Sequence, residues 1–326
     1  MGCNLPVALI VRIRQFMWHN SLITQLAVSP VCGYLARDAG AAEPTAISAL
    51  ALAAHGQTDA ARQAADWLAA TQATDGSVAV RRNTDGPCWP TSLAVLAWHA
   101  VDPVDFAEQI DRAVTWMLSI RGKTQVRSSE IKHDPTLVAW PWVVGTHSWI
   151  EPTALHVLAL KATGYGDHPR VREAVRLLVD RQIPGGGCNY GNTGVLGQTL
   201  WPHVQPTGLA LWALGGETLG RGRIKASIAW LRQALCQRTT CTSLAWGLLG
   251  LQAHDSHRGG TIPDGASDWI EQAQARNSAG QRSAYKAALL SLAAGAVEGR
   301  DCLTAPEVRD TSTTRGPDHA VEENVQ

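Results

Sequence analysis

The residues best suited to acid–base chemistry lie in one stretch of the chain, between positions 123 and 153. Asp134 and His147 fall inside this stretch, and Glu151 stands directly before a Pro-Thr step at its end. A carboxyl or imidazole group can donate a proton to a bound substrate, so if the protein is an enzyme we expect Glu151, Asp134 or His147 to be its catalytic acid. Isolated loop carboxylates and histidines also serve as surface or capping residues, which is the competing interpretation.

Tryptophan is unusually abundant, with 13 Trp beside only two Phe and four Tyr. The indole ring offers a large apolar surface, and its face attracts cations, including a carbocation. We expect the substrate-binding residues to be aromatics and one histidine at loop and buried-helix positions, namely Trp98, Trp140, Trp142, Trp149, Tyr190, Trp201, His203, Trp212 and Trp246. The competing interpretation of the loop tryptophans is a packed plug. Four others are expected only to pack the repeat described below: Trp67, Trp116, Trp230 and Trp269.

A glycine-rich segment at residues 184–207 presents Cys188 and His203, which could act as nucleophile and base. The segment has no lysine and no G-x-x-x-x-G-K-[ST] pattern, so it is not a phosphate-binding loop. The same pair could bind a metal with a nearby carboxylate, as could the two histidines within residues 254–257. Neither set follows a metal-binding motif, so no metal site is predicted and the cofactor is unknown.

The elements that position these residues come from one phrase that recurs six times, an apolar segment opened in most copies by a Pro-Thr or Thr-Ser step. Self-similarity at this spacing is typical of a repeat architecture. The segments have almost no polar face, which predicts helices buried on all sides. The six copies are Glu43–Gly56, Trp89–Ala100, Glu151–Gly164, Gln205–Gly216, Cys241–His254 and Ser283–Gly295.

The start of each copy carries helix-initiating residues. The prolines are expected at the first helical position, where no N–H is needed; they are Pro44, Pro90, Pro152 and Pro206. Because the six helices would run parallel to one another, Glu43, Glu151 and Gln205 are expected to gather at one mouth of the assembly. The carboxylates would complement the helix dipoles there, or they would face a ligand.

Amphipathic segments alternate with the copies, at 59–72, 106–121, 168–182, 222–236 and 266–278. We therefore predict an all-α fold, an α/α toroid of about six helical hairpins, with an apolar inner ring and an amphipathic outer ring. The predicted domain covers residues 1–300, with an outer helix within residues 1–30 near Pro6–Gln25. Residues 301–326 are expected to form a disordered polar tail.

The outer segments AADWLAATQATDGS and AVRLLVDRQIPGGG resemble the QW-type repeat of squalene–hopene cyclases, with a tryptophan or leucine, a glutamine and a glycine turn. The Pro-Thr helices are similar to those of protein prenyltransferase β subunits. The resemblance covers about Gly33–Gly295 and implies an α/α toroid with an apolar central cavity. It implies a protein that binds or transforms a prenyl or terpenoid substrate. The chain lacks the family's D-x-D-D, D-D-x-x-D and D-x-C motifs, so the alternative is a non-catalytic toroid, a scaffold or binding protein.

Composition limits the partners. The 28 basic residues balance the 28 acidic ones, which disfavours a nucleic-acid partner. No apolar stretch is long enough to span a membrane. The apolar segment Leu5–Ile13 contains Arg12 and is followed by Arg14, which disfavours a signal peptide. The seven cysteines without C-x-x-C pairs favour a reducing, cytoplasmic location. An apolar isoprenoid ligand is the expected small-molecule partner, and a protein partner remains open.

Overall fold

The computed structural model describes residues 22–255, 261–280, 282–300 and 302–303. The protein is mostly helical, which confirms the all-α prediction. The only named strands among these residues are β1 (Gly194–Val195) and β2 (Gln198–Thr199), a short antiparallel hairpin that was not predicted. The predicted N-terminal outer helix lies largely outside the described residues, although residues 22–28 are helical. The predicted tail lies outside them too, apart from residues 302 and 303.

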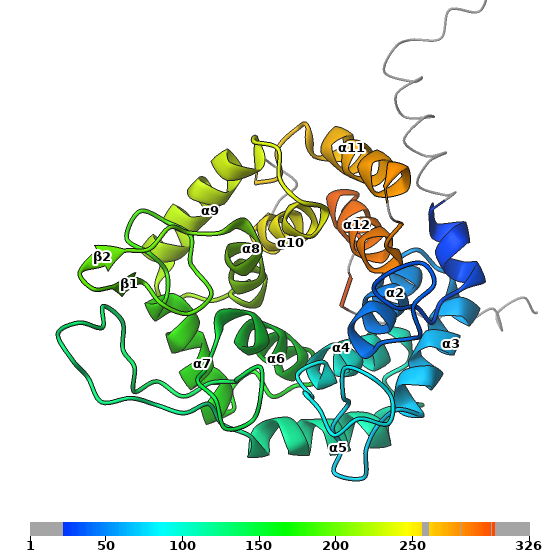
Figure 1. Cartoon of the computed structure of the whole chain (residues 1–326), viewed down its shortest axis with the longest axis horizontal. Coiled ribbons are helices and arrows are strands. Elements are labelled where there is room, and N and C mark those ends of the chain that lie inside the picture. The colour runs from blue at the N-terminus through cyan, green and yellow to red at the C-terminus, as the bar shows by residue number, and fades with distance from the viewer. Residues whose placement is uncertain (1–21, 256–260, 281, 301, 304–326) are drawn as a thin grey trace, which may run out of the picture.

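The six apolar copies form helices that contact one another in a closed circuit. Each contacts the next in chain order, and the last contacts the first (Figure 1). Nearly every residue of these helices is buried, as expected for helices without a polar face. They are α2 (Ala42–Ala54), α4 (Thr91–Val101), α6 (Ile150–Ala162), α8 (Val204–Ala213), α10 (Cys241–Gln252) and α12 (Ala284–Val297).

The amphipathic segments form helices outside this circuit (Figure 1). Each packs one face against one or two members of the circuit, and α3, for example, buries a single stripe of alanines and Leu68. The predicted segments match the observed helices to within a few residues. They are α3 (Thr58–Ala69), α5 (Ala107–Ser119), α7 (Pro169–Asp180), α9 (Arg221–Leu235) and α11 (Ala266–Ala279). Among the described residues, no helix has the length and apolar composition needed to cross a membrane.

The predicted position of the prolines is wrong by one to two residues. Pro44, Pro152 and Pro206 occupy the third position of α2, α6 and α8, and Pro90 is the residue before α4. A proline anywhere in the first helical turn lacks only an N–H that has no intrahelical acceptor, so the helix can begin before it.

The recurring threonine joins each circuit helix to the chain segment that precedes it. The Thr153 hydroxyl accepts the Trp140 N–H at 3.2 Å and also lies 3.2 Å from the Trp140 carbonyl oxygen, to which it can donate. The same two-way contact recurs in three other copies, as the pairs Thr45–Cys32, Thr91–Val78 and Thr207–Cys188. The repeat therefore specifies a backbone clamp as well as a helix start.

Thr153→Val should lower the free energy of unfolding by about 2 kcal/mol, because valine keeps the shape but leaves the buried Trp140 N–H without an acceptor. Urea denaturation measures this. Thr115→Val is the matched control, because that exposed hydroxyl bonds only to the Asp111 carbonyl within α5. Equal stability of the two variants would contradict the clamp.

The glutamine and glycine of the outer repeat connect successive outer helices. Gln72, after α3, donates to the carbonyls of Gly76 and Gln109 and accepts from Arg112 of α5. A Cβ on Gly76 would lie 2.3 Å from the Arg112 carbonyl oxygen, so only glycine permits this approach. Gln182 and Gly186, after α7, make the corresponding contacts to α9.

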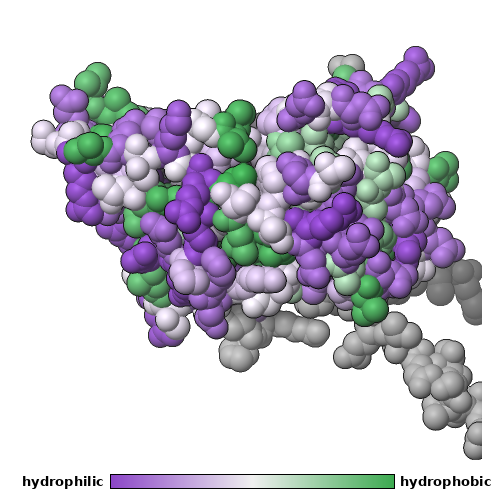
Figure 2. Space-filling view, turned by 90° about the horizontal axis from the view of Figure 1, so that it is seen from below, coloured by the Kyte–Doolittle hydropathy of each residue, from purple (hydrophilic) through white to green (hydrophobic). Residues whose placement is uncertain are grey.

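Two long insertions interrupt the repeat, residues 120–149 and residues 181–203. Figure 1 places both beside α6, α7 and α8, on the same side of the molecule. Exposed hydrophobic side chains are frequent here (Figure 2, left end). They are Val126, Val143, Val144, Tyr190, Val195, Leu196 and Trp201.

Candidate functional site

Two glutamates lie at the N-terminal ends of circuit helices, as the repeat predicted. Glu151, the second residue of α6, is only 6% exposed and accepts a 2.9 Å hydrogen bond from Gln205 of α8. Glu43, the second residue of α2, is half-buried and close enough for its charge to act on Glu151. The predicted gathering of Glu43, Glu151 and Gln205 at one mouth is therefore observed.

Tyrosines from distant parts of the chain complete this cluster. The Tyr34 hydroxyl donates to Glu43 at 2.7 Å, and the Tyr34 and Tyr285 rings meet edge to face at 5.7 Å. Tyr285, in α12, is also within hydrogen-bonding reach of Glu43 and of the Trp246 indole. No pattern in the sequence marks either tyrosine, because only the contact between α12 and α2 brings residues 34 and 285 together.

Burial is the main cause that shifts the acidity of both carboxyls. It raises the pKa of Glu151 to about 7, and the nearby Glu43 charge raises it further. Burial also raises the pKa of Glu43, although its tyrosine partners oppose the shift. Two close carboxyls in a poorly solvated site do not both ionise easily, so the pair retains a proton at or near neutral pH. A retained proton is what a general acid requires.

Trp246 contacts Tyr285 of this cluster, and Trp212 lines a hollow at the opposite, C-terminal ends of the circuit helices. The two tryptophan rings lie 5.8 Å apart between α8 and α10. Trp212 lines a hollow of about 620 Å³ at the C-terminal ends of α4, α6, α8 and α10, together with Leu158, Leu249 and Leu303. Polar side chains also line it, namely His99, Lys161 and Gln252, and Gly299, Cys302 and Leu303 after α12 complete it, so the hollow is a mixed polar and apolar site at the C-terminal mouth of the circuit. Trp212 therefore lines a cavity as predicted, whereas Trp246 is buried behind it and lines no part of the hollow, and the substrate-binding role of both stays a prediction.

Trp98 and Trp140 correct the prediction. The Trp98 indole donates to the Ala65 carbonyl of α3 at 3.1 Å, so it points away from the interior, towards the outer helices. The Trp140 indole donates to the Met117 carbonyl of α5 at 2.7 Å, and the Arg170 guanidinium lies 4.9 Å above its ring. Each buried indole N–H needs an acceptor, and the outer helices supply it.

The other predicted aromatics belong to the two insertions. Trp142 packs edge to face on Trp89, with ring centres 4.7 Å apart. Tyr190 and His203 form a ring pair at 5.2 Å. A second pocket, described below, lies between the two insertions. Trp201 is 84% exposed and lines neither this pocket nor the interior hollow, so its predicted substrate-binding role is not supported. Trp149 does line that second pocket.

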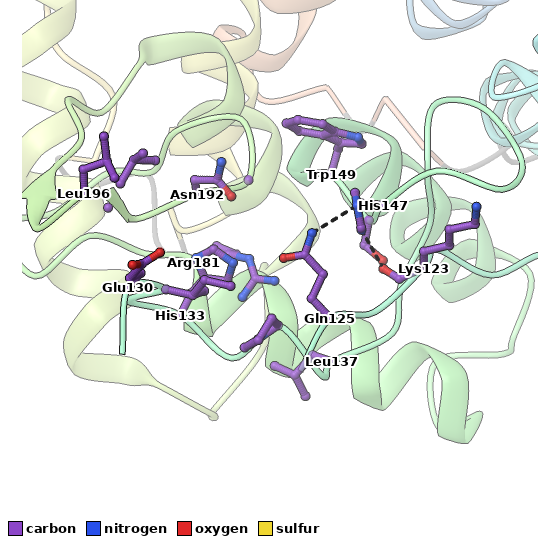
Figure 3. Close-up of a pocket in the computed structure, with 16 residues that line it drawn as sticks. Lys123, Gln125, Glu130, His133, Leu137, His147, Trp149, Arg181, Asn192 and Leu196 are labelled. Carbon is purple, nitrogen blue, oxygen red and sulfur yellow. Dashed lines mark hydrogen bonds between the residues drawn. The ribbon is translucent and has the colours of Figure 1, made fainter. Parts of the chain in front are cut away.

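Asp134 and His147 lie in the first insertion and not in the carboxyl cluster. Asp134 accepts the hydroxyl and N–H of Thr136 and pairs with Arg127, and these partners lower its pKa despite some burial. A carboxyl with a lowered pKa is ionised at neutral pH and has no proton to donate, which corrects the acid role predicted for Asp134. His147 donates from Nδ1 to the Lys123 carbonyl and contacts Gln125 through Nε2, each at 3.2 Å (Figure 3). His147 lines the second pocket, and its predicted acid role stays a prediction.

Cys188 and His203 meet through their backbones. The His203 N–H donates to the Cys188 carbonyl at 2.9 Å. Complete burial raises the pKa of the Cys188 thiol to about 12. A buried thiol of this kind is not a nucleophile at neutral pH, so the predicted nucleophile–base pair is not supported.

The predicted alternatives with a metal find no support either. Among the described residues, no three His, Cys, Asp or Glu side chains are grouped to hold a metal ion. His254 contacts the Leu211 carbonyl at 2.8 Å, and His257 lies outside the described residues.

Comparison with known proteins adds no relative. The chain matches no family model, and no curated protein sequence is significantly similar to it.

Proposed function

We propose that this protein is an α/α toroid that binds an apolar, isoprenoid-type molecule inside the helix circuit, with Glu151 as the proton donor. The observation that carries the proposal is the buried Glu151 carboxyl, whose pKa of about 7 leaves a proton available near neutral pH. The closed circuit of helix contacts supports the toroid, and the Trp212, Leu158, Leu249 and Leu303 side chains in the hollow support a ligand with apolar surface.

The chemistry that fits these groups is protonation of an isolated alkene. The Glu151 proton would add to one alkene carbon, leaving a carboxylate on the enzyme and a carbocation on the substrate. A long isoprenoid would extend from the hollow at the C-terminal helix ends, past Trp212 and Trp246, to Glu151 at the N-terminal end of α6. The two indole faces would stabilise the cation, and loss of a proton or addition of water would end the reaction. Binding without chemistry, as a scaffold or carrier, is the competing function, and the absence of the family's catalytic motifs favours it.

Squalene or farnesol should raise the melting temperature of the purified protein, because a ligand that binds only the folded state stabilises it. Trp212→Ala should raise the ligand concentration needed for half of this thermal shift at least about tenfold, because it removes a wall of the hollow. Trp201→Ala is the matched control, an exposed tryptophan outside the hollow. Mass spectrometry of an organic extract tests for a co-purified isoprenoid. A lipid-free extract together with no thermal shift would contradict the proposal and favour the scaffold.

A further inference from the structure

A second pocket lies between the two insertions, outside the helix circuit (Figure 3). It has a volume of about 280 Å³ and is lined by residues 123–149 of the first insertion, by Arg181, and by residues 191–196 of the second. It shares no lining residue with the interior hollow. Its ligand is therefore argued from its own groups and does not rest on the proposed isoprenoid function.

Arg181 is the central charged group of this pocket. The residue is only 5% exposed, and its Nη1 donates to the Asp134 carbonyl at 3.0 Å and to the Asp180 carboxylate at 2.6 Å. Its other terminal nitrogen, Nη2, makes no hydrogen bond within the described part of the chain. Arg170, which is similarly buried, instead uses both terminal nitrogens on the carbonyls of Leu118 and Ile120. Arg181 thus keeps a donor that no described residue satisfies.

Further donors surround Arg181. Figure 3 shows the Asn192 amide on the same side of the pocket as Arg181, and the Gln125 amide and Lys123 follow along its length. Neither the Lys123 ammonium nor the Asn192 amide has a hydrogen-bond partner among the described residues. The carboxylate in the lining, Glu130, lies away from Lys123, at the same end of the pocket as Arg181 (Figure 3). Lys123 and Arg181 give the lining two positive charges against the one negative charge of Glu130, with Asp180 pairing Arg181 from outside the pocket. The donors of Arg181, Asn192 and Lys123 that have no partner among the described residues suit an oxyanion.

Apolar side chains supply the rest of the lining. The Trp149 ring forms one wall, and Leu196 lies at the far end, on the turn between β1 and β2. Leu196 has a φ of 49°, a left-handed conformation that a leucine rarely adopts, and its side chain is 82% exposed. An asparagine would suit this turn position better, so the leucine contributes an apolar surface and not turn stability.

We propose that this pocket binds a small organic oxyanion, a carboxylate or phosphate group held by Arg181 and Asn192, with an apolar body between Trp149 and Leu196. Lys123 adds a positive charge at the rim. The pocket has room for a molecule of about ten non-hydrogen atoms, on the scale of a substituted benzoate.

Isothermal titration of the full chain with benzoate, acetate and inorganic phosphate tests this proposal. Benzoate should bind about tenfold tighter than acetate, because the two share a head group and differ only in the apolar body. Asn192→Ala combined with Lys123→Gln should weaken benzoate binding at least about tenfold. Lys225→Gln, an exposed lysine on α9 outside this pocket, is the charge control and should bind as the wild type.

Leu196→Asn separates the apolar body from the head group. This substitution should leave the melting temperature unchanged or raise it, while the ratio of the acetate and benzoate dissociation constants falls towards one. Failure of benzoate to bind at about 10 mM, or unchanged binding in the Asn192 and Lys123 double variant, would overturn the site. Phosphate binding tighter than benzoate, with no effect of Leu196→Asn, would overturn the apolar body.

Discussion

Gly208→Ala is expected to lower the free energy of unfolding by about 3 kcal/mol, although alanine is the better helix former by about 1 kcal/mol. A Cβ on Gly208 of α8 would lie 2.4 Å from the Trp246 carbonyl oxygen, and one on Gly250 of α10 would lie 2.3 Å from the Gly208 carbonyl oxygen. The two helices touch backbone to backbone here. No flexible side chain can move aside, so one helix must shift.

Gly222→Ala is the matched control for this prediction. Gly222 lies in α9, and a Cβ added to it would meet no atom within 4 Å. This variant should be as stable as the wild type or more stable, by up to about 1 kcal/mol. Urea denaturation of both variants decides the matter, and a shift of the same sign and size in both would show that α8 and α10 tolerate separation.

The close approach of α8 and α10 also positions the interior tryptophans. Trp212 follows Gly208 by one helical turn, and Trp246 precedes Gly250 by one turn, so the two indoles meet beside the glycine contact. Forcing the helices apart would therefore move the wall of the hollow as well as lower stability. Gly208→Ala should weaken any response to squalene or farnesol for this reason.

The sequence predicts which helices are buried more reliably than it predicts what each side chain faces. A missing polar face distinguishes the circuit helices from the amphipathic ones, and the recurring Glu43, Glu151 and Gln205 predict the cluster at one mouth. A helix that is apolar all round carries no mark of its inward face, which is why Trp98 and Trp212 looked equivalent. Their indole N–H groups separate them, because Trp98 finds its acceptor in α3.

Contacts between segments that are distant in the chain could not be predicted from the sequence, for a different reason. Tyr34 and Tyr285 meet Glu43 only because α12 packs on α2. In the sequence, nothing distinguishes Arg181 from other basic residues at the ends of amphipathic helices. Only its hydrogen bonds in the structure show that one terminal nitrogen is left without a partner among the described residues. A repeat pattern predicts features that recur, whereas these residues act at positions where the repeat is interrupted or closed.

Glu151→Gln is expected to make the protein more stable above neutral pH, by about 2–3 kcal/mol, and equally stable near pH 4. The folded state raises the pKa of Glu151 from 4.5 to about 7, so the folded protein holds this proton more tightly than the unfolded chain. The wild type therefore loses stability as the pH rises from about 4.5 to about 7, and the loss is complete above that range. At about 1.4 kcal/mol for each pKa unit, the full difference corresponds to about 3 kcal/mol.

Urea denaturation between pH 4 and pH 8 measures this difference. Glutamine cannot ionise, so the variant should lack the part of the decline that Glu151 causes. Glu108→Gln on α5 is the matched control, because that side chain is 82% exposed, and its stability profile should follow the wild type. Parallel profiles for Glu151→Gln and the wild type would show that Glu151 ionises like an ordinary carboxyl, and the proton-donor proposal would then fail.

Activity should move in the opposite direction from stability. Once an isoprenoid substrate is found, Glu151→Gln should lower kcat at least about 100-fold, because the amide keeps the contact with Gln205 but has no acidic proton. A variant that is more stable above pH 7 yet inactive would show that the buried carboxyl lowers stability and is needed for the reaction. The Glu151→Gln variant could instead be more stable and still turn over substrate normally. That result would assign the proton to Glu43, whose pKa is also raised. The buried pair would then keep its role, with its two members exchanged.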